Sequence, residues 1–387
     1  MLISTLAKSK SCFRPKRQLV IPFARCSLNK NQFSSFNSSA IMASENTAAW
    51  IPSAKADIEV GSAPVYEPGP GELLIKNKSL AFNPLDWKIQ KLGIFVDKYP
   101  AIIGWSFAGT VEKIGPEVKG FSIGDRVVAE RKMMIPKPGP QYSTMQKYVI
   151  TGDSNVGKLP DSVSLDAASA SVTNLMTAVG ALNLSMGLER PPSTGVAEPN
   201  GKKLLVYGGS SVLGRQTSEL ARRAGYTVVT TSSPANIAEV RRFAPDSAII
   251  DHILPQAEVI DQLAKLGPFD YLFDTITTPA TKPVLAGVLQ RQGGGVYWSV
   301  APASPDPDLP AGVERKGASY PGIVEADEEA NRWFFDELLT AGLASGAVTA
   351  PKIQKLSGGL NSVQDALDRM MKNTAGGAKL VVDPWET

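Results

Sequence analysis

The sequence predicts an α/β protein in which a β-rich region is joined to a doubly wound parallel sheet. Two observations support this fold class. Short apolar segments separated by glycine and proline fill residues 50–150, and from about residue 202 strand-like segments alternate with helical ones. Such alternation is typical of right-handed βαβ units in a parallel sheet. A length of 387 residues with 43% hydrophobic and 20% charged residues fits a globular protein with two hydrophobic cores.

The first region contains the weaker strand signals. A turn cluster at residues 64–71 has three prolines and two glycines and precedes the apolar run Leu73-Leu74-Ile75. We expect further strands at residues 107–114 and 126–130, because these runs are apolar and bounded by glycines.

The second region has clearer periodicity. Strands are predicted at residues 203–207, 227–231, 248–250, 271–275 and 295–300, with helices at 212–224 and 258–266. The tail should add helices at 331–344 and 363–372 and a last strand at 379–382.

Residues 1–41 differ from the rest in composition. They carry seven Lys or Arg residues, many serines and no acidic residue, which is typical of a mitochondrial transit peptide; the alternative is that translation starts at Met42. Beyond them remain 33 basic and 37 acidic residues, so nothing indicates binding to nucleic acid. No run of about 18 apolar residues predicts a membrane span. We therefore expect a cytoplasmic protein, or a mitochondrial one if the leader is a true transit peptide.

Side chains that bind zinc are nearly missing. The sequence has two cysteines, Cys12 and Cys26, and one histidine, His252. A structural zinc takes four Cys or His ligands and a catalytic zinc about three from Cys, His and carboxylate. The sequence therefore predicts no metal site and an organic cofactor.

A glycine-rich turn at residues 208–214 follows the predicted strand at 203–207 and opens a predicted helix. Gly209 and Gly214 match the first and last glycines of a dinucleotide-binding turn, whereas Ser211 stands at the middle glycine. Amides at such a helix N-terminus can bind a pyrophosphate. The turn alone is a weak signal, but its place between strand and helix favours nucleotide binding.

The strand predicted at 227–231, the second of the parallel sheet, indicates which dinucleotide the protein would bind. Enzymes that use NAD place an acidic residue near its end, and this sequence has none between Glu219 and Glu239. Residues 230–236 offer hydroxyl groups and an amide instead, and Arg241 and Arg242 follow. This pattern favours NADP(H). The alternative for the two arginines is a solvent-exposed helix face.

With these features in order, the chain resembles the medium-chain dehydrogenase/reductase superfamily over about residues 48–385. It is most similar to the zinc-free branch, which includes fungal trans-acting enoyl reductases, relatives called zinc-binding oxidoreductases, and quinone oxidoreductases. The resemblance rests on the blocks Asn83–Lys88, Gly104–Val111, Gly124–Val127, Leu159-Pro160, Thr177-Ala178, Gly208–Gly214 and Gly377–Val382.

The resemblance implies a GroES-like catalytic domain formed by residues 42–175 and 322–387, and a Rossmann cofactor-binding domain at 176–321. The implied contacts of the cofactor are Thr177, Gly209, Ser210, Ser211, Val212, Leu213, Gly214, Ser233, Asn236, His252, Thr275, Ser299 and Val300. By position, Ser233 and Asn236 would face the 2′-phosphate and His252 the adenosine, so a catalytic role for His252 is not favoured.

The departures from the zinc enzymes concern the reacting end. Asn83 stands where those enzymes have a cysteine, and Gly104-Trp105-Ser106 replaces Gly-His-Glu. Lys88, Asn83 and Asp86 are the candidate catalytic residues, in a predicted loop at 83–88, with Lys88 as an electrostatic or proton-donating group. The alternative is that Asn83 and Asp86 only cap or turn that loop. Trp87 and Trp105 are candidate substrate contacts, and Trp105 would fill the space that the metal ligand vacates.

This inventory predicts an NADPH-dependent, zinc-independent reductase of an activated C=C bond in an enone or enoyl thioester. The alternatives are a quinone or carbonyl reductase and a non-catalytic nucleotide-binding relative. The expected partners are a small-molecule substrate and no nucleic acid or membrane, for a monomer or homodimer.

Overall fold

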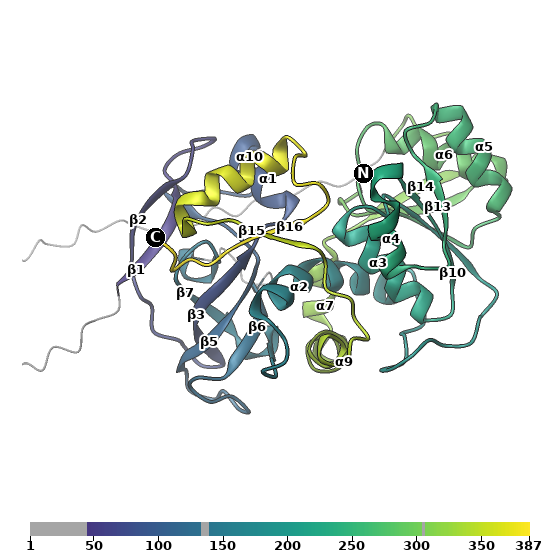
Figure 1. The fold of residues 1–387 in the computed structure, drawn as a ribbon. Helices are drawn as coiled ribbons and strands as arrows, with labels where there is room; N and C mark the ends of the chain where they lie inside the picture. The colour runs from purple at the N-terminus through teal and green to yellow at the C-terminus, as the bar shows by residue number, and fades with distance from the viewer. Residues whose placement is uncertain (1–44, 133–138, 304–305) are drawn as a thin grey trace, which may run out of the picture. The chain divides into compact units, whose positions relative to one another are not determined.

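The computed structural model describes residues 45–132, 139–303 and 306–387 (Figure 1). The predicted leader at 1–41 lies outside these ranges. The β-rich part contains a mixed sheet with the strand order β15-β16-β3-β5-β6-β8, in which β7 also pairs with β3. These strands are β3 (Glu72–Ala81), β5 (Ser106–Ile114), β6 (Arg126–Glu130), β7 (Tyr148–Gly152), β8 (Val156–Lys158), β15 (Ile353–Lys355) and β16 (Lys379–Val382).

Strand β3 organises this sheet. Its side chains alternate between two cores, since Leu73 and Ile75 pack with Phe107 while Leu74 packs with Tyr148 on the opposite side. The strand continues past the predicted Leu73–Ile75 run through polar residues. One of them, Asn77, is fully buried and donates from its amide to the carbonyls of Thr144 and Gln146, so the strand continues without apolar side chains there.

A small antiparallel sheet, β2-β1-β4, lies beside helices α1 and α10. Its strands are β1 (Asn46–Ile51), β2 (Glu59–Ala63) and β4 (Ala101–Ile102), and the helices are α1 (Pro84–Leu92) and α10 (Val363–Met371). The two helices run side by side in Figure 1, and their residues Ile89 and Leu367 belong to one apolar core.

The expectation that residues 83–88 form a loop is wrong. They begin α1, with Asn83 at the N-cap and Pro84 in the first turn. The Asp86 carboxylate accepts a hydrogen bond from the Asn83 backbone N–H at 2.7 Å, so this pair does cap the chain. The helix was missed because its apolar positions are few: Ile89 is its one fully buried aliphatic residue.

The second part is the predicted parallel sheet, with the strand order β11-β10-β9-β12-β13-β14. All its strands are parallel, and the strand order switches between β9 and β12: β10 and β11 lie on one side of β9, and β12 to β14 on the other. This is the order of a doubly wound fold, which confirms the predicted fold class. The strands are β9 (Lys203–Tyr207), β10 (Thr227–Ser232), β11 (Ala248–Asp251), β12 (Tyr271–Asp274), β13 (Gly295–Ser299) and β14 (Val313–Gly317). The helices between them are α3 (Val212–Arg223), α4 (Ile237–Phe243), α5 (Gln256–Leu266) and α6 (Thr281–Arg291).

Helix α2 (Leu165–Val179) contacts elements of both parts: β3, β5 and β6 on one side and α3 on the other. Small residues make this possible. Ser169 and Ala170 are fully buried, and the Ser169 hydroxyl lies 2.8 Å from that of Ser79 on β3. The sequence prediction missed α2, because small residues on all sides leave a weak helical period.

The predicted helix at 331–344 is a composite of α8 (Glu328–Arg332), a π-helical stretch η5 (Trp333–Ala341) and α9 (Gly342–Ser345). The adjacent residues Phe334 and Phe335 are both buried there. Helix α7 (Tyr320–Ala326) precedes it and contacts α2. Within the described ranges, no helix has the length and apolar character that crossing a bilayer requires.

Candidate functional site

The turn between β9 and α3 leaves no room for a side chain at Gly209 or Gly214. A Cβ on Gly214 would lie 2.2 Å from the Gly208 carbonyl oxygen, and one on Gly209 would lie 2.0 Å from Oγ1 of Thr230. Gly208 has a backbone φ of 92°, a value that residues with a side chain rarely adopt. Ser211 is the N-cap of α3, and its Oγ accepts from the Gly214 N–H at 2.9 Å. The glycines therefore let α3 approach the sheet closely.

This turn fits the pyrophosphate of a dinucleotide. The first amides of a helix, here those of Val212 and Leu213, have no acceptors within the helix, and the helix dipole favours an anion in front of them. Helix α3 has 12 residues, and its first turn carries no acidic side chain. The groups that would repel phosphate are thus missing at the N-terminus of α3.

The end of β10 carries hydroxyl groups. The side-chain amide of Asn236 donates to Oγ of Ser233 at 3.0 Å, which brings together the two residues predicted to face a 2′-phosphate. The two arginines considered for this role are engaged elsewhere. Arg241 donates to the carbonyls of Pro245 and Ser247 at 2.6 Å, and Arg242 pairs with Glu239 at 2.7 Å.

A different arginine, Arg215, is buried in the first turn of α3. Its Nη2 donates to the Gly377 carbonyl at 2.5 Å, and its Nη1 lies 3.5 Å from the Glu239 carboxylate. Gly377 in turn lies near Asn236, since a Cβ on that glycine would be 4.0 Å from Oδ1. The sequence analysis did not single out Arg215, because an arginine inside an amphipathic helix normally faces solvent.

Three of the predicted cofactor contacts, Thr275, Ser299 and Val300, lie at the ends of strands β12 and β13. The hydroxyl groups of Ser211 and Thr275 are 3.2 Å apart, and Thr275 also donates to the Tyr207 carbonyl at 2.8 Å. The Val300 N–H donates to the Asp274 carbonyl, which holds the chain after β13 beside β12. The structure thus brings Ser211 and Thr275 together.

The other predicted cofactor contacts are more scattered. The Thr177 hydroxyl donates to the Thr173 carbonyl on α2 at 2.7 Å, and the Ser299 hydroxyl accepts from Nε of Arg315 at 3.0 Å. His252 is exposed in the turn after β11, which is the edge strand two places from β9. Whether these residues contact a cofactor stays a prediction.

A buried chain of polar side chains starts at Asn83. Its Oδ1 accepts from Nζ of Lys379 at 2.6 Å, and its Nδ2 donates to Oγ of Ser106 at 2.9 Å. Ser106 shares a short hydrogen bond with the Thr173 hydroxyl, which donates to the Glu130 carboxylate at 2.5 Å. The chain therefore joins β16, the start of α1, β5, α2 and the end of β6.

Burial shifts the charges of this cluster. It raises the pKa of Asp86 to about 7 and that of Glu130 to about 8, and it lowers the pKa of Lys379 to about 8. The positive charges of Lys379 and Arg131 partly oppose the shift of Asp86. One oxygen of each carboxyl, Oδ1 of Asp86 and Oε1 of Glu130, lacks a hydrogen-bond partner among the described residues. At neutral pH the cluster thus retains protons that isolated carboxylates would lose.

The three remaining candidates lie at the edge of this cluster. Nζ of Lys88 lies 5.9 Å from the ring centre of its neighbour Trp87, and the buried ammonium bonded to Asn83 is that of Lys379 instead. Trp105 is half-buried with Arg131 over its ring at 4.9 Å. Its indole N–H is buried and meets no acceptor among the described residues. That Trp105 fills the space of the metal ligand and contacts the substrate stays a prediction.

Sequence reasoning missed Glu130, Lys379 and Thr173. The available signal was position: Glu130 is the last residue of the apolar strand β6, and Lys379 is the first residue of the apolar strand β16. Both side chains are almost fully buried, at 1% and 4% exposure, where charged residues are rare unless paired.

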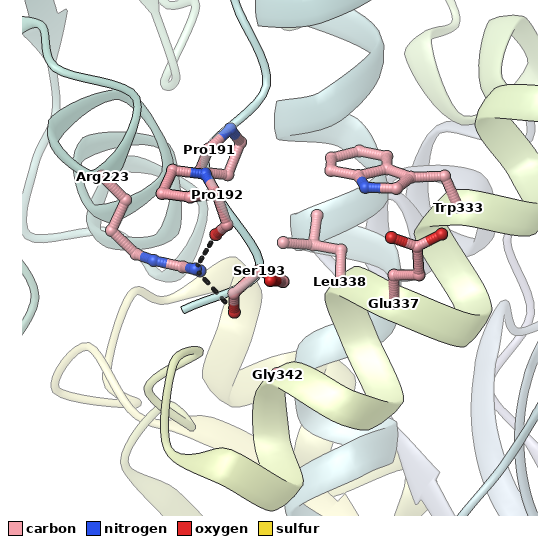
Figure 2. A pocket seen from close by; sticks show the side chains of 8 residues that line it. All are labelled: Pro191, Pro192, Ser193, Arg223, Trp333, Glu337, Leu338 and Gly342. Atoms are coloured by element: carbon pink, nitrogen blue, oxygen red, sulfur yellow. Dashed lines mark hydrogen bonds between the residues drawn. The ribbon is translucent and has the colours of Figure 1, made fainter. Parts of the chain in front are cut away.

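A small pocket lies elsewhere (Figure 2). It is lined by residues 191–193, Arg223 and part of the π-helical stretch, and its volume is about 10 Å³. Figure 2 shows the Arg223 guanidinium bonded to the carbonyls of Pro192 and Ser193. That volume corresponds to about one water molecule and excludes a substrate.

The described residues hold no group of three or more His, Cys, Asp or Glu side chains that could bind a metal ion. Cys12 and Cys26 lie outside those residues. In the polar chain around Asn83, an amide and hydroxyl groups stand where thiolate or imidazole would be required, so its donor set does not fit zinc.

Comparisons with known proteins cover almost the whole described chain. Residues 69–161 match the alcohol dehydrogenase GroES-like domain. The chain is 31% identical over 355 residues to the dehydrogenase orsE of Emericella nidulans, covering 87% of this chain and 99% of the relative. It is 33% identical over 348 residues to the trans-enoyl reductase himH of Aspergillus japonicus, covering 87% and 97%. A quinone oxidoreductase structure from Pseudomonas syringae pv. tomato DC3000 matches the fold with a TM-score of 0.70 at 18% identity, over 88% of this chain and all of that one.

Proposed function

Because the chain belongs to the medium-chain dehydrogenase/reductase superfamily, a family of oxidoreductases, we propose that it uses NADPH to reduce the C=C bond of an enone or enoyl thioester. We also propose that this reaction does not require zinc. Its relative himH carries the name trans-enoyl reductase, which supports this reaction type.

One observation carries the proposal: a chain of amide, hydroxyl and ammonium groups, a donor set that does not fit zinc, runs from Lys379 to Glu130 through Asn83 and Ser106. By the resemblance, zinc-dependent members have Cys and Glu at the positions of Asn83 and Ser106. Without a Lewis acid, a simple alcohol or ketone is hard to activate. A conjugated C=C bond is already activated by its carbonyl group, and the protein has only to stabilise the charge that develops on that oxygen.

The residues fit a nicotinamide dinucleotide in the following way. The backbone of residues 209–214 would hold the pyrophosphate, Ser233 and Asn236 the 2′-phosphate, and Thr177, Thr275, Ser299 and Val300 would lie toward the nicotinamide. A bound NADPH would supply the hydride. Asn83, Asp86 and Lys88 would lie at the reacting end, with Trp87 and Trp105 beside the substrate.

The reaction is tested by product analysis. Purified protein with NADPH should reduce enones and enoyl thioesters to saturated carbonyl compounds, and unconjugated ketones at least about 100-fold more slowly. The reaction should persist in the presence of a metal chelator. Hydroquinone formation without C=C reduction would favour a quinone reductase, and cofactor binding without turnover of any acceptor would favour a non-catalytic relative.

The cofactor preference has its own test. NADPH should bind more tightly than NADH, and Ser233→Asp should narrow or reverse this preference, because a carboxylate repels the 2′-phosphate. Ser233→Ala is the matched control and should weaken NADPH binding without favouring NADH. Equal affinities of the unchanged protein for the two cofactors would contradict the assignment.

A further inference from the structure

The Lys379 side chain is placed unlike an ordinary lysine. It is 4% exposed, its ammonium donates to Oδ1 of Asn83 at 2.6 Å, and the charges of Asp86 and Glu130 act on it. Burying an ammonium costs several kcal/mol unless nearby groups compensate. The fold nevertheless places this residue at the start of β16, beside the N-cap of α1.

The charged groups around it come from several elements. Asp86 belongs to α1, Glu130 ends β6, and the half-buried Arg131 follows it. Glu130 reaches Asn83 through the hydroxyl groups of Thr173 and Ser106. Lys379 and Glu130 thus stand at the two ends of one hydrogen-bonded chain.

We propose that the Lys379 ammonium supplies, as a built-in cation, the positive charge that zinc supplies in the metal-dependent members of the superfamily. This inference rests on the proposed reaction. The resemblance places Asn83 where zinc-dependent members have a cysteine, and the Asn83 side-chain oxygen accepts a hydrogen bond from the Lys379 ammonium. The donor set that does not fit zinc fits a lysine, because an amide oxygen accepts a hydrogen bond from Nζ.

The charge has a use in the reaction. When hydride adds to the β-carbon of an enone, negative charge develops on the carbonyl oxygen. A fixed cation in a site of low dielectric constant lowers the energy of that state more than water would. Lys379 is bonded to Asn83 and is buried, so it acts as a positioning residue: it fixes the Asn83 side chain and contributes a positive field.

Its role in turnover is tested with Lys379→Met, Lys379→Arg and the control Lys352→Met in the full chain. Lys352 directly precedes the neighbouring strand β15, and its side chain is exposed. Its backbone carbonyl accepts a hydrogen bond from the Lys379 N–H, which the substitution keeps, so loss of its side chain should leave activity unchanged. We expect Lys379→Met to lower kcat for an enone about 100-fold, with NADPH affinity unchanged within about 3-fold, and Lys379→Arg to recover part of the loss. Added zinc should restore nothing.

Its role as a compensating charge is tested without turnover. At about pH 8, where Glu130 is partly ionised, Lys379→Met should lower the melting temperature more in the unchanged protein than in a Glu130→Gln background, because Glu130→Gln removes the buried carboxylate that the ammonium balances. If Lys379→Met alone does not fold, the double variant should fold. This measurement stands even if the unchanged protein reduces no enone, so failure of the proposed reaction and failure of this inference can be distinguished.

Two results would overturn the inference. One is a Lys379→Met variant that keeps its kcat. The other is additive losses of melting temperature in the single and double variants, or a double variant that folds no better than Lys379→Met, since these would show that the ammonium does not balance Glu130.

Discussion

At the scale of single residues, the cluster around Asn83 holds two carboxyl groups that are buried away from solvent. Asp86 and Glu130 are 0% and 1% exposed, and each has one oxygen without a partner among the described residues. Such groups are costly to ionise, so the protein stores protons there near neutral pH. Stability should therefore depend on pH in a range where most surface carboxylates no longer titrate.

Glu130→Gln tests this dependence. The pKa of Glu130 is raised from 4.5 to about 8, so the folded protein binds its proton more tightly than the unfolded chain does between those pH values. Its contribution is complete below about pH 4.5 and is lost as the pH rises through about 8, at most about 5 kcal/mol. From pH 5 to pH 8 the free energy of unfolding of the unchanged protein should fall by a few kcal/mol relative to Glu130→Gln.

Urea unfolding at the two pH values measures the difference. Glu198→Gln serves as the control, because Glu198 is exposed and its removal should not alter the pH dependence. A difference between the unchanged protein and Glu130→Gln that is the same at pH 5 and pH 8 would contradict the raised pKa.

The residues of this cluster differ in how far the sequence could predict them. Asn83 and Asp86 could be identified as candidate residues because they lie three positions apart in a recognisable sequence block. The capping interpretation holds, since the Asp86 carboxylate accepts from the backbone N–H of the N-cap Asn83. The catalytic interpretation stays a prediction. Lys379 could not be found in the same way. It is 296 residues from its partner Asn83, and only the sheet pairing of β16 with β3 brings them together.

At the scale of elements, the turn between β9 and α3 sets how closely the helix approaches the sheet. Gly214→Ala would place a Cβ 2.2 Å from a backbone oxygen, which no side-chain rotation relieves. We expect a loss of about 1–3 kcal/mol in stability and at least about 10-fold in NADPH affinity, because the first turn of α3 must move.

Thermal unfolding and a binding titration of NADPH measure these effects. Gly61→Ala is the control, since a Cβ there meets only Trp50 at 3.8 Å, an ordinary contact. A Gly214→Ala protein with unchanged NADPH affinity would show that the turn does not hold the cofactor.

The elements themselves were predictable where their pattern was strong. Strands β6, β9 and β16 begin and end at the predicted residues, because apolar runs bounded by glycine or charge leave few alternatives. Helix α2 was not predicted, because its small residues show no clear helical period. Their role is tertiary: they allow β3 and α3 to pack closely against α2. That information is tertiary and is not visible in a local window.

At the scale of the whole molecule, the predicted leader should be dispensable. Deletion of residues 1–41 should leave melting temperature and NADPH binding unchanged, because an acid-free segment of that composition is not expected to bury a core. Deletion of residues 1–51 is the contrast. It removes β1, in which Ala48, Ala49 and Ile51 are buried, and should prevent folding.

Loss of folded protein on the shorter deletion would mean that the leader belongs to the fold. The bounds predicted for the domains, 42–175 with 322–387 and 176–321, stay a prediction. The general layout followed from the alternation of strands and helices, whereas the pairing of β16 with β3 could be expected only from the resemblance.

The pairing of β16 with β3 also sets an order of events during synthesis. Asp86 and Glu130 leave the ribosome early, whereas the ammonium that balances them is added hundreds of residues later. Until then the end of β3 that pairs with β16 is an open edge, and the two carboxyl groups lack the nearby ammonium. A chain interrupted before β16 therefore contains the predicted cofactor turn but lacks the Lys379 ammonium that is bonded to Asn83.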